Sequence, residues 1–363
     1  MSSEREALKR QFLLDTGLGQ ARRELLTGDA STRSYERLHL ADAKTRILMD
    51  QPPVESAVCV PDATDQERQA LGYNALARLA GGRVDAFVSV ASWLQDQGLS
   101  APVIFAQDSS HGLAVMEDLG DDLFARLIEA GAPEEPFYDA AIDALVQMQA
   151  AVPPALLTGP DGAVWPLLTY DDLALKTAGD LLPEWLPALR PEVRLDDSAR
   201  QDWETIWNPI RAAGVQGASV FCHRDYHVEN LIWLPARTGA ARVGLVDFQD
   251  ALVAHPVWDL SMLLHDARRD VSRACEARSL ERYLAHRPQG DLPRFMADYH
   301  GLGALNISRI IGIFSRLVVR DRKPRYEGFL PRMWDYLDRC LADPALSDLK
   351  TWFDTHVPAG ARR

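Results

Sequence analysis

The residues with the clearest chemical potential lie in the stretch 221–230 and in a second short stretch about twenty residues later. Asp225 carries a carboxylate that can accept a hydrogen bond from a hydroxyl group. Asn230 and Asp247 carry the kind of oxygen ligands that Mg²⁺ prefers. A carboxylate that orients a hydroxyl, together with an Asn and an Asp that hold metal ions, are the parts that phosphoryl transfer requires.

Apolar runs on both sides of this polar loop predict the strands that position it. The runs 218–222 and 231–234 flank the loop, and the run 242–248 returns after a turn at Thr238–Gly239. A hairpin between the last two runs would bring Asp247 close to Asn230. The alternative is a polar turn whose Asp and Asn only satisfy backbone groups. The combined spacing, His-x-Asp-x-x-x-x-Asn followed by a strand and Asp-Phe, favours the catalytic interpretation.

Composition limits the classes of protein and partner. The chain has 363 residues, 52 acidic and 39 basic, with a net charge of −13. This acidic balance argues against general nucleic-acid binding, which depends on Lys and Arg. The four cysteines are scattered without C-x-x-C spacing, which fits a reducing compartment. The N-terminus is charged, and no apolar run reaches the roughly 18 residues of a membrane span. We therefore expect a cytoplasmic protein without a membrane segment. We expect a small-molecule substrate, and no obligate protein partner is evident.

The order of periodic segments predicts an α+β fold. An amphipathic helix is expected over 4–16, and short strands over 23–26, 36–40, 46–50, 101–106 and 113–116. The stretch 54–84 has the character of an insertion, with a helix over 69–79, and a further helix is expected over 85–97. Mostly helical sequence follows. We therefore expect a first lobe over 1–117 and a second lobe over 118–363.

The loop and the Asp-Phe pair resemble those of the aminoglycoside phosphotransferase and choline kinase branch of the protein-kinase-like fold. Further stretches resemble the bacterial anomeric kinases of N-acetylmuramate and N-acetylglucosamine; they are 28–35, 47–53, 116–121 and 311–317. The resemblance covers most of the chain apart from 54–84. It implies a small β-rich N-terminal lobe, a larger helical C-terminal lobe, and ATP- and Mg²⁺-dependent phosphorylation of the sugar C1 hydroxyl in peptidoglycan recycling.

Roles in the second half of the chain follow from this chemistry. Asp225 would take the proton of the sugar hydroxyl late in transfer, while Asn230 and Asp247 would hold Mg²⁺ on the ATP phosphates. His223 is expected to fix the loop by hydrogen bonds rather than to carry a proton. Asp259 falls where the family has an Asp that supports the loop, and its alternative role is that of an acid at a helix N-terminus.

The first lobe is expected to bind ATP through a small-residue turn and a hinge. Gly28 and Ser31 belong to the turn, and Arg33 adds a positive charge that can meet phosphate. A simple hairpin turn is the alternative. Glu117 and Leu119 would form the hinge whose backbone reads adenine, although an acidic residue at a strand end is commonly only solvated.

The first lobe also departs from the kinase pattern. Met49 and Asp50 occupy the strand position where kinases carry a phosphate-binding Lys, and the helix over 85–97 has no interior Glu to pair with such a Lys. Arg33 is our best substitute cation. This departure keeps a non-catalytic nucleotide-binding protein as an alternative, beside another small-molecule kinase acting on aminoglycosides, choline or homoserine.

Five residues of the second lobe are candidates for binding the sugar: Asp180, Trp185, Asn306, Arg309 and Arg316. Arg309 and Arg316 are seven positions apart and share a helix face. The lactyl carboxylate of N-acetylmuramate would favour an arginine partner. Solvated or structurally paired charges are the alternative for each of them.

Overall fold

The computed structural model describes residues 3–26, 33–53 and 61–362. The chain forms two compact units, each built from separate segments. The first unit comprises residues 1–132, 154–167 and 229–251, and the second comprises 133–153, 168–228 and 252–363. The loop 223–230 therefore begins in the second unit and ends in the first. The lobe boundary expected after residue 117 stays a prediction.

The first unit contains a five-stranded antiparallel sheet with the strand order β1-β2-β3-β5-β4. Its strands are β1 (Arg22–Leu26), β2 (Ser34–His39), β3 (Thr45–Asp50), β4 (Ile104–Asp108) and β5 (Leu113–Glu117). The described part of the unit also contains two hairpins: β6 (Leu156–Thr158) with β7 (Val164–Pro166), and β9 (Leu231–Trp233) with β10 (Val243–Leu245). The helices are α1 (Ser3–Asp15), α2 (Asp65–Leu71), α3 (Tyr73–Leu76), α4 (Val84–Asp96) and α5 (Phe124–Glu129).

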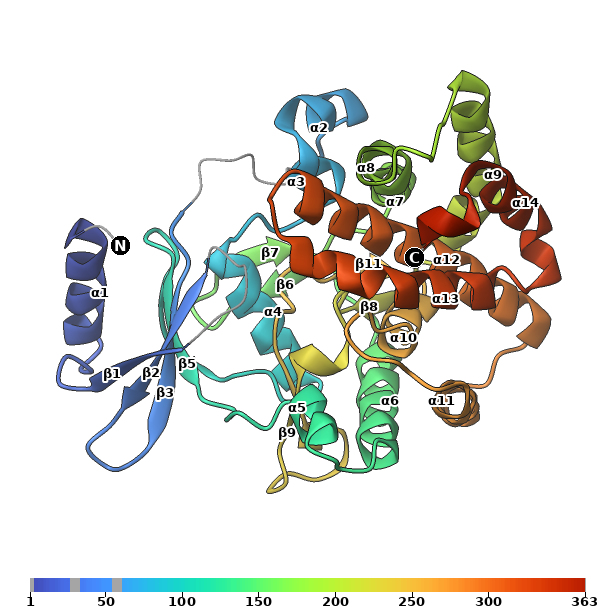
Figure 1. Ribbon diagram of the computed structural model, residues 1–363. Helices are drawn as coiled ribbons and strands as arrows, with labels where there is room; N and C mark the ends of the chain where they lie inside the picture. The colour runs from blue at the N-terminus through green and yellow to red at the C-terminus, as the bar shows by residue number, and fades with distance from the viewer. Residues whose placement is uncertain (1–2, 27–32, 54–60, 363) are drawn as a thin grey trace. The chain divides into compact units, whose positions relative to one another are not determined.

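Helix α1 covers one face of this sheet (Figure 1). Phe12 and Leu13 of α1 pack against Leu38 of β2 and Leu48 of β3. Side chains alternate between the faces of a strand, so Met49 points away from α1, where it lines a small cavity together with Phe87 of α4. The central strand β3 is therefore covered on both faces, and this explains why Ile47 to Asp50 are all buried.

The expected helix over 69–79 is interrupted. The structure has two short helices, α2 and α3, separated at Gly72, which has φ +94°. This left-handed backbone conformation is favourable for glycine and breaks the helical path. Thr64 caps α2 by accepting a hydrogen bond from Glu67 N, and the Glu67 side chain accepts from Thr64 N in return.

The second unit is mainly helical and contains one short antiparallel pair, β8 (Val220–Cys222) with β11 (Leu252–Ala254). Its helices are α6 (Glu135–Ala150), α7 (Asp172–Gly179), α8 (Leu181–Leu189), α9 (Asp197–Gln216), α10 (Val257–Leu264), α11 (Arg273–His286), α12 (Leu292–Val319), α13 (Leu330–Cys340) and α14 (Ser347–His356). Short 3₁₀ helices lie at Val228–Asn230, Gly239–Arg242, Pro324–Phe329, Pro344–Leu346 and Ala359–Arg362. The predicted α+β class, with a β-rich first part and a helical second part, is confirmed.

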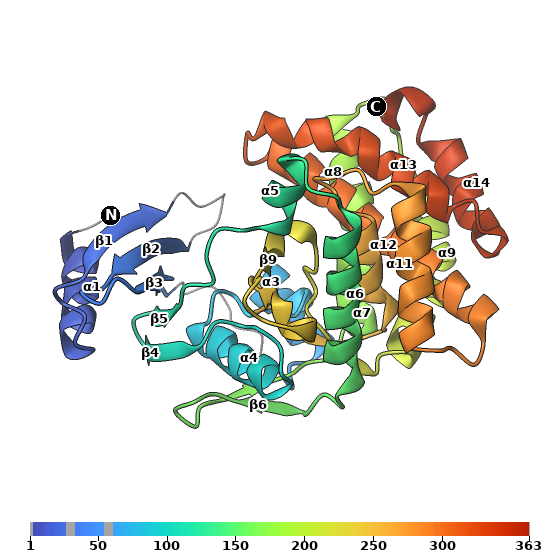
Figure 2. The same cartoon turned by 90° about the horizontal axis from the view of Figure 1, so that it is seen from below.

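Helix α12 is the central element of the second unit and contacts α7, α8, α9, α10 and α13. Figure 2 shows α6 beside α11, and Arg278 and Arg282 of α11 form ion pairs with Asp139 and Asp143 of α6. Gly312 lets α12 approach α8 closely, because an added Cβ would lie 2.3 Å from the Leu181 carbonyl carbon. Among the described residues, α12 alone is long and apolar enough to cross a membrane, and 67% of its most apolar window is buried within the protein.

Candidate active site

Asp259 fixes the start of the loop that carries Asp225. Its carboxylate accepts hydrogen bonds from the backbone N–H of His223 (2.6 Å) and of Arg224 (2.8 Å), and from the Cys222 thiol (3.2 Å). Arg224 has φ +76°, a left-handed conformation that is unfavourable for a residue with a side chain. The hydrogen bonds to Asp259 therefore hold the loop in a turn that it would not adopt by local preference alone.

Asp259 lies in the first turn of α10 and is completely buried. Burial raises the pKa of its carboxyl to about 6, while hydrogen bonds from Cys222, His223 and Arg224 act in the opposite direction. Asp259 thus has the position that the helix-terminus alternative describes, and its carboxylate also reaches the loop backbone. Its role in supporting the loop stays a prediction.

His223 links the loop backbone to the core of the second unit. Its ring is buried, and Nδ1 accepts a 3.3 Å hydrogen bond from the backbone N–H of Asp225. The neighbouring Tyr226 ring lies edge-on to it, and the Tyr226 hydroxyl donates to the carbonyl of Ala141 at 2.7 Å. These contacts hold the loop backbone against the core of the second unit, and the positioning role of His223 stays a prediction.

The carboxylate of Asp225 is accessible. Its side chain is 43% exposed, and Oδ1 lies 3.8 Å from Nε2 of the buried His227. The Arg268 guanidinium contacts the same His227 nitrogen, with Nη1 at 3.2 Å. A half-exposed carboxylate on a fixed backbone can receive a hydrogen bond from an incoming hydroxyl.

The hairpin expected after the loop is present in the first unit. Leu231 pairs with Leu245, and the backbone N–H of Val246 donates to the carbonyl of Asn230 at 3.2 Å. Asn230 and Asp247 are therefore neighbours across the open end of the β9–β10 hairpin. Asp247 has φ +62°, and its carboxylate is 43% exposed.

The segment after Asp247 is anchored within the first unit. The Phe248 ring stacks on Phe87 of α4 with ring centroids 4.8 Å apart. The next acid, Asp250, accepts a 2.7 Å hydrogen bond from the backbone N–H of Ala80. These contacts fix the backbone of Asp247 in spite of its unfavourable φ angle.

Arg33 supplies positive charge beside this hairpin. Its Nη1 donates to Gln249 Oε1 at 2.8 Å and lies 3.3 Å from Asp247 Oδ1. Tyr35 of β2 lies on the same side, with its hydroxyl 3.4 Å from Arg33. Gly28 and Ser31, the other residues predicted for the phosphate-binding turn, lie outside the described residues.

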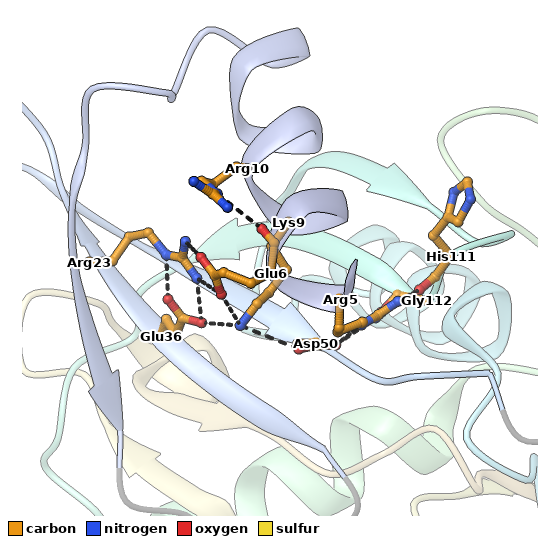
Figure 3. A network of polar contacts seen from close by, with 9 residues as sticks. All are labelled: Arg5, Glu6, Lys9, Arg10, Arg23, Glu36, Asp50, His111 and Gly112. Atoms are coloured by element: carbon orange, nitrogen blue, oxygen red, sulfur yellow. Dashed lines mark hydrogen bonds and ion pairs between the residues drawn. The ribbon is translucent and has the colours of Figure 1, made fainter. Parts of the chain in front are cut away.

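The side chain of Asp50 lies on the face of the sheet that α1 covers. It is buried and pairs with Arg5 of α1 at 2.5 Å, and its other oxygen lies 3.5 Å from Lys9 Nζ. Lys9 is fully buried and also pairs with Glu36 at 2.6 Å, as Figure 3 shows. Arg5 and Lys9 of α1 therefore neutralise Asp50, and Lys9 together with Arg23 of β1 neutralises Glu36. Arg33, in contrast, contacts the Asp247 carboxylate.

Asn230 and Asp247 fit a magnesium ion by donor type. The described residues contain no group of three or more His, Cys, Asp or Glu side chains that could hold a metal alone. Mg²⁺ commonly takes one or two protein oxygens and completes its coordination with water and phosphate oxygens. An exposed carboxylate beside an Asn matches that pattern.

The predicted hinge lies in the same unit as the hairpin. Glu117 ends β5, and its carboxylate pairs with Arg237. Leu119 packs over β10, where an added Cβ on Gly244 would lie 3.2 Å from the Leu119 Cδ1 atom. The first unit therefore combines the hinge residues, Arg33 and the hairpin of Asn230 and Asp247.

The five sugar-binding candidates divide into separate groups in the second unit. Asp180 accepts hydrogen bonds from Lys176 (2.8 Å) and Trp203 (3.2 Å), and it lines a surface groove of about 380 Å³ with both. Trp185 lies partly buried on α8. Asn306 is buried and accepts a 2.9 Å hydrogen bond from Arg309 Nε, while Arg316 lies about two helical turns further along α12. Asp180 and Arg309 thus have different partners, and neither contact set includes Asp225.

The sequence motifs did not indicate that Arg268 lies near the Asp225 loop. It follows α10, the helix that carries Asp259, in the run His265-Asp266-Ala267-Arg268-Arg269. An arginine a few residues beyond the loop-supporting Asp was the available signal. Only the fold shows that this arginine returns to His227 and so to the neighbourhood of Asp225.

The chain has the architecture of a phosphotransferase of the protein-kinase-like fold. It combines a five-stranded antiparallel sheet and a helical second part with the Asp225 loop and the Asn230–Asp247 hairpin. Residues 22–297 match the phosphotransferase enzyme family. The chain belongs to this family.

Curated relatives match along nearly the whole chain. A protein of Caulobacter vibrioides named N-acetylmuramate/N-acetylglucosamine kinase is 64% identical over 364 residues, covering 100% of this chain and 99% of the relative. A protein of the same name from Pseudomonas aeruginosa is 28% identical, covering 89% of this chain and 85% of that relative.

Two solved structures share the fold. A Plasmodium vivax ethanolamine kinase has a TM-score of 0.57 at 9% identity, with 94% of this chain and 89% of that chain covered. An ADP-bound aminoglycoside phosphotransferase has a TM-score of 0.51 at 16% identity, with 93% and 97% covered. At these identities the similarity concerns the fold alone.

Proposed function

We propose that this protein is an ATP-dependent kinase that phosphorylates the anomeric C1 hydroxyl of N-acetylmuramate and N-acetylglucosamine. The observation that carries the choice of substrate is the 64% identity, over the full length, to a relative named for these two sugars. The supported Asp225 loop and the exposed Asp247 carboxylate carry the choice of reaction.

In this proposal, Asp225 receives the hydrogen bond of the C1 hydroxyl and takes its proton as the phosphoryl group is transferred. An anomeric hydroxyl is more acidic than an ordinary alcohol, so a carboxylate is a sufficient base. Asn230 and Asp247 would hold Mg²⁺, which neutralises charge on the phosphates of ATP. Arg33 adds a fixed positive charge, and the Glu117–Leu119 hinge would contact adenine.

We also propose a cytoplasmic setting, in which the protein serves peptidoglycan recycling. Three cysteines in the described part of the chain, Cys222, Cys275 and Cys340, are buried free thiols, which suits a reducing compartment. ATP as phosphoryl donor fits the same setting.

The test is product identification. Purified protein with ATP, Mg²⁺ and either sugar should give a sugar phosphate that is stable to alkali and labile to acid, as expected for a 1-phosphate. A panel with choline, homoserine and an aminoglycoside serves as the comparison. Turnover of a panel member with neither amino sugar used would overturn the substrate assignment.

A variant separates catalysis from nucleotide binding. Asp225→Asn should lower kcat by roughly a hundredfold to ten-thousandfold, the range for loss of a general base, while ATP binding measured by calorimetry is retained. A wild-type protein that binds ATP but transfers phosphate to no member of the panel would indicate a non-catalytic nucleotide-binding protein.

A further inference from the structure

Arg268 contacts His227, the imidazole that lies next to the carboxylate of Asp225. Its side chain is exposed, and its Nη1 lies 3.2 Å from Nε2 of His227. The same Nε2 atom lies 3.8 Å from Oδ1 of Asp225. All three residues belong to the second unit. One buried imidazole therefore spaces the guanidinium from the predicted catalytic base.

The guanidinium of Arg268 can bind more than His227. It has only N–H donors, so it donates to Nε2 of His227 in this contact. Its further N–H groups can bind a planar anion in bidentate fashion.

The backbone around Arg268 is firmly held. Its N–H donates to Asp266 Oδ1 at 2.8 Å, and Arg332 of α13 donates to the carbonyl of Ala267 at 2.8 Å. Tyr336 of α13 donates its hydroxyl to the carbonyl of Arg269 (2.9 Å) and accepts from the N–H of Val271 (2.6 Å). The guanidinium therefore projects from a fixed segment, which limits the entropy lost when it binds a ligand.

We infer that Arg268 binds the lactyl carboxylate of N-acetylmuramate and thereby sets the preference for this sugar over N-acetylglucosamine. The inference rests on the proposed function. Only one ring carbon separates C1, whose hydroxyl meets Asp225, from C3, which bears the lactyl ether. A lactyl carboxylate on the same ring can therefore reach the neighbourhood of the base, where Arg268 contacts His227.

Two other arginines of the second unit, Arg269 and Arg309, contact protein side chains. The Arg269 guanidinium pairs with Glu134, and Arg309 donates to Asn306. Among contacts of the described residues, the Arg268 side chain uses one N–H group, on His227. The sequence suggested Arg309 and Arg316 for the lactyl carboxylate. Arg309 donates to Asn306, whereas Arg268 contacts the imidazole next to Asp225, and this position favours Arg268 over Arg309.

The test compares both sugars on Arg268→Gln. Loss of a charge-assisted hydrogen bond should raise KM for N-acetylmuramate roughly tenfold to a hundredfold. KM and kcat for N-acetylglucosamine should change less than about threefold, which also shows that the variant is folded. The matched control is Arg273→Gln, which removes an exposed arginine at the start of α11 and should leave both sugars unaffected.

A neutral ligand provides a second measurement on the wild-type protein. The lactyl amide of N-acetylmuramate should show the same increase in KM with wild type that the acid shows with Arg268→Gln. The variant should not distinguish the acid from the amide. If the two changes are instead additive, the carboxylate has a partner other than Arg268.

The outcomes separate this inference from the proposed function. If wild type phosphorylates neither sugar, the proposed function fails. If wild type uses both sugars and Arg268→Gln lowers kcat equally for both, Arg268 acts on Asp225 through His227 and the inference fails. Unchanged kinetics for both sugars in the variant would overturn the inference as well.

Discussion

The backbone N–H of His223 donates a 2.6 Å hydrogen bond to Oδ2 of Asp259, a residue 36 positions further along the chain. This bond joins the first residue of the Asp225 loop to α10. The other carboxylate oxygen accepts from Arg224 and Cys222, so one buried side chain fixes three consecutive residues. The orientation of Asp225 therefore depends on a residue outside the loop.

Replacing this acceptor should weaken the fold and catalysis together. In Asp259→Asn the amide NH₂ would face N–H or S–H donors, so one of them loses its partner, at a cost of about 1–3 kcal/mol. We expect a lower urea midpoint and a lower kcat, with ATP affinity unchanged. Asp270→Asn, at an exposed acid of the same segment, is the control. Full kcat in Asp259→Asn would contradict a supporting role.

The raised pKa of Asp259 predicts how the difference in stability between wild type and Asp259→Asn depends on pH. Its carboxyl has a pKa of about 6 in the folded protein, against an ordinary value of 3.8, so the folded state binds the proton more tightly. The associated stability is present below about pH 4 and is lost as pH rises through 6. The stability of wild type relative to Asp259→Asn should fall by on the order of 1 kcal/mol between pH 5 and pH 7. If the stability of wild type relative to Asp259→Asn instead rises between pH 5 and pH 7, the pKa of Asp259 is not raised.

Arg33 should matter for ATP rather than for the sugar. It contacts Gln249 and Asp247, so its charge lies beside the predicted metal and phosphate position. Arg33→Gln should lower kcat/KM for ATP roughly tenfold to a hundredfold, the loss expected for one charge-assisted hydrogen bond. Steady-state kinetics with varied ATP measure this change. Arg22→Gln, at an arginine of β1 whose side chain is 67% exposed, should match wild type.

The donor set at the hairpin predicts a specific metal dependence. Chelation of divalent metal with EDTA should stop turnover, and added Mg²⁺ should restore it. Asp247→Asn should raise the Mg²⁺ concentration for half-maximal activity at least about tenfold, because the anionic ligand is lost. Asp250→Asn tests the neighbouring acid, whose carboxylate accepts from Ala80 N and should not share this effect. Equal Mg²⁺ requirements for both variants would exclude Asp247 as the ligand.

The buried charges beneath α1 should be essential for stability. Lys9 is fully buried between Glu36 and Asp50 (Figure 3), and its removal leaves both acids with reduced compensation. Lys9→Met should cost about 3 kcal/mol, at the low end of the range for breaking a buried pair, because Arg5 and Arg23 remain. Urea unfolding measures this loss. Lys44→Met removes a lysine that is 78% exposed and should change stability little.

Local patterns predicted the elements around the loop with useful accuracy. Short strand candidates bounded by turn signals indicated β2 and β3, and the turn at Thr238–Gly239 indicated the β9–β10 hairpin that brings Asp247 next to Asn230. Periodicity failed at Gly72, where a positive φ angle splits the expected helix. Each success depended on short-range signals, which are available in the sequence.

The sequence by itself determined the class of chemistry, because the types and spacing of Asp225, Asn230 and Asp247 are local properties of the chain. Tertiary structure decided which partners the charged side chains have. It assigned Lys9 to the buried face of the sheet, Arg33 to Asp247 and Arg268 to His227. Such long-range partners are set by how strands and helices pack, and no local spacing of residues encodes them.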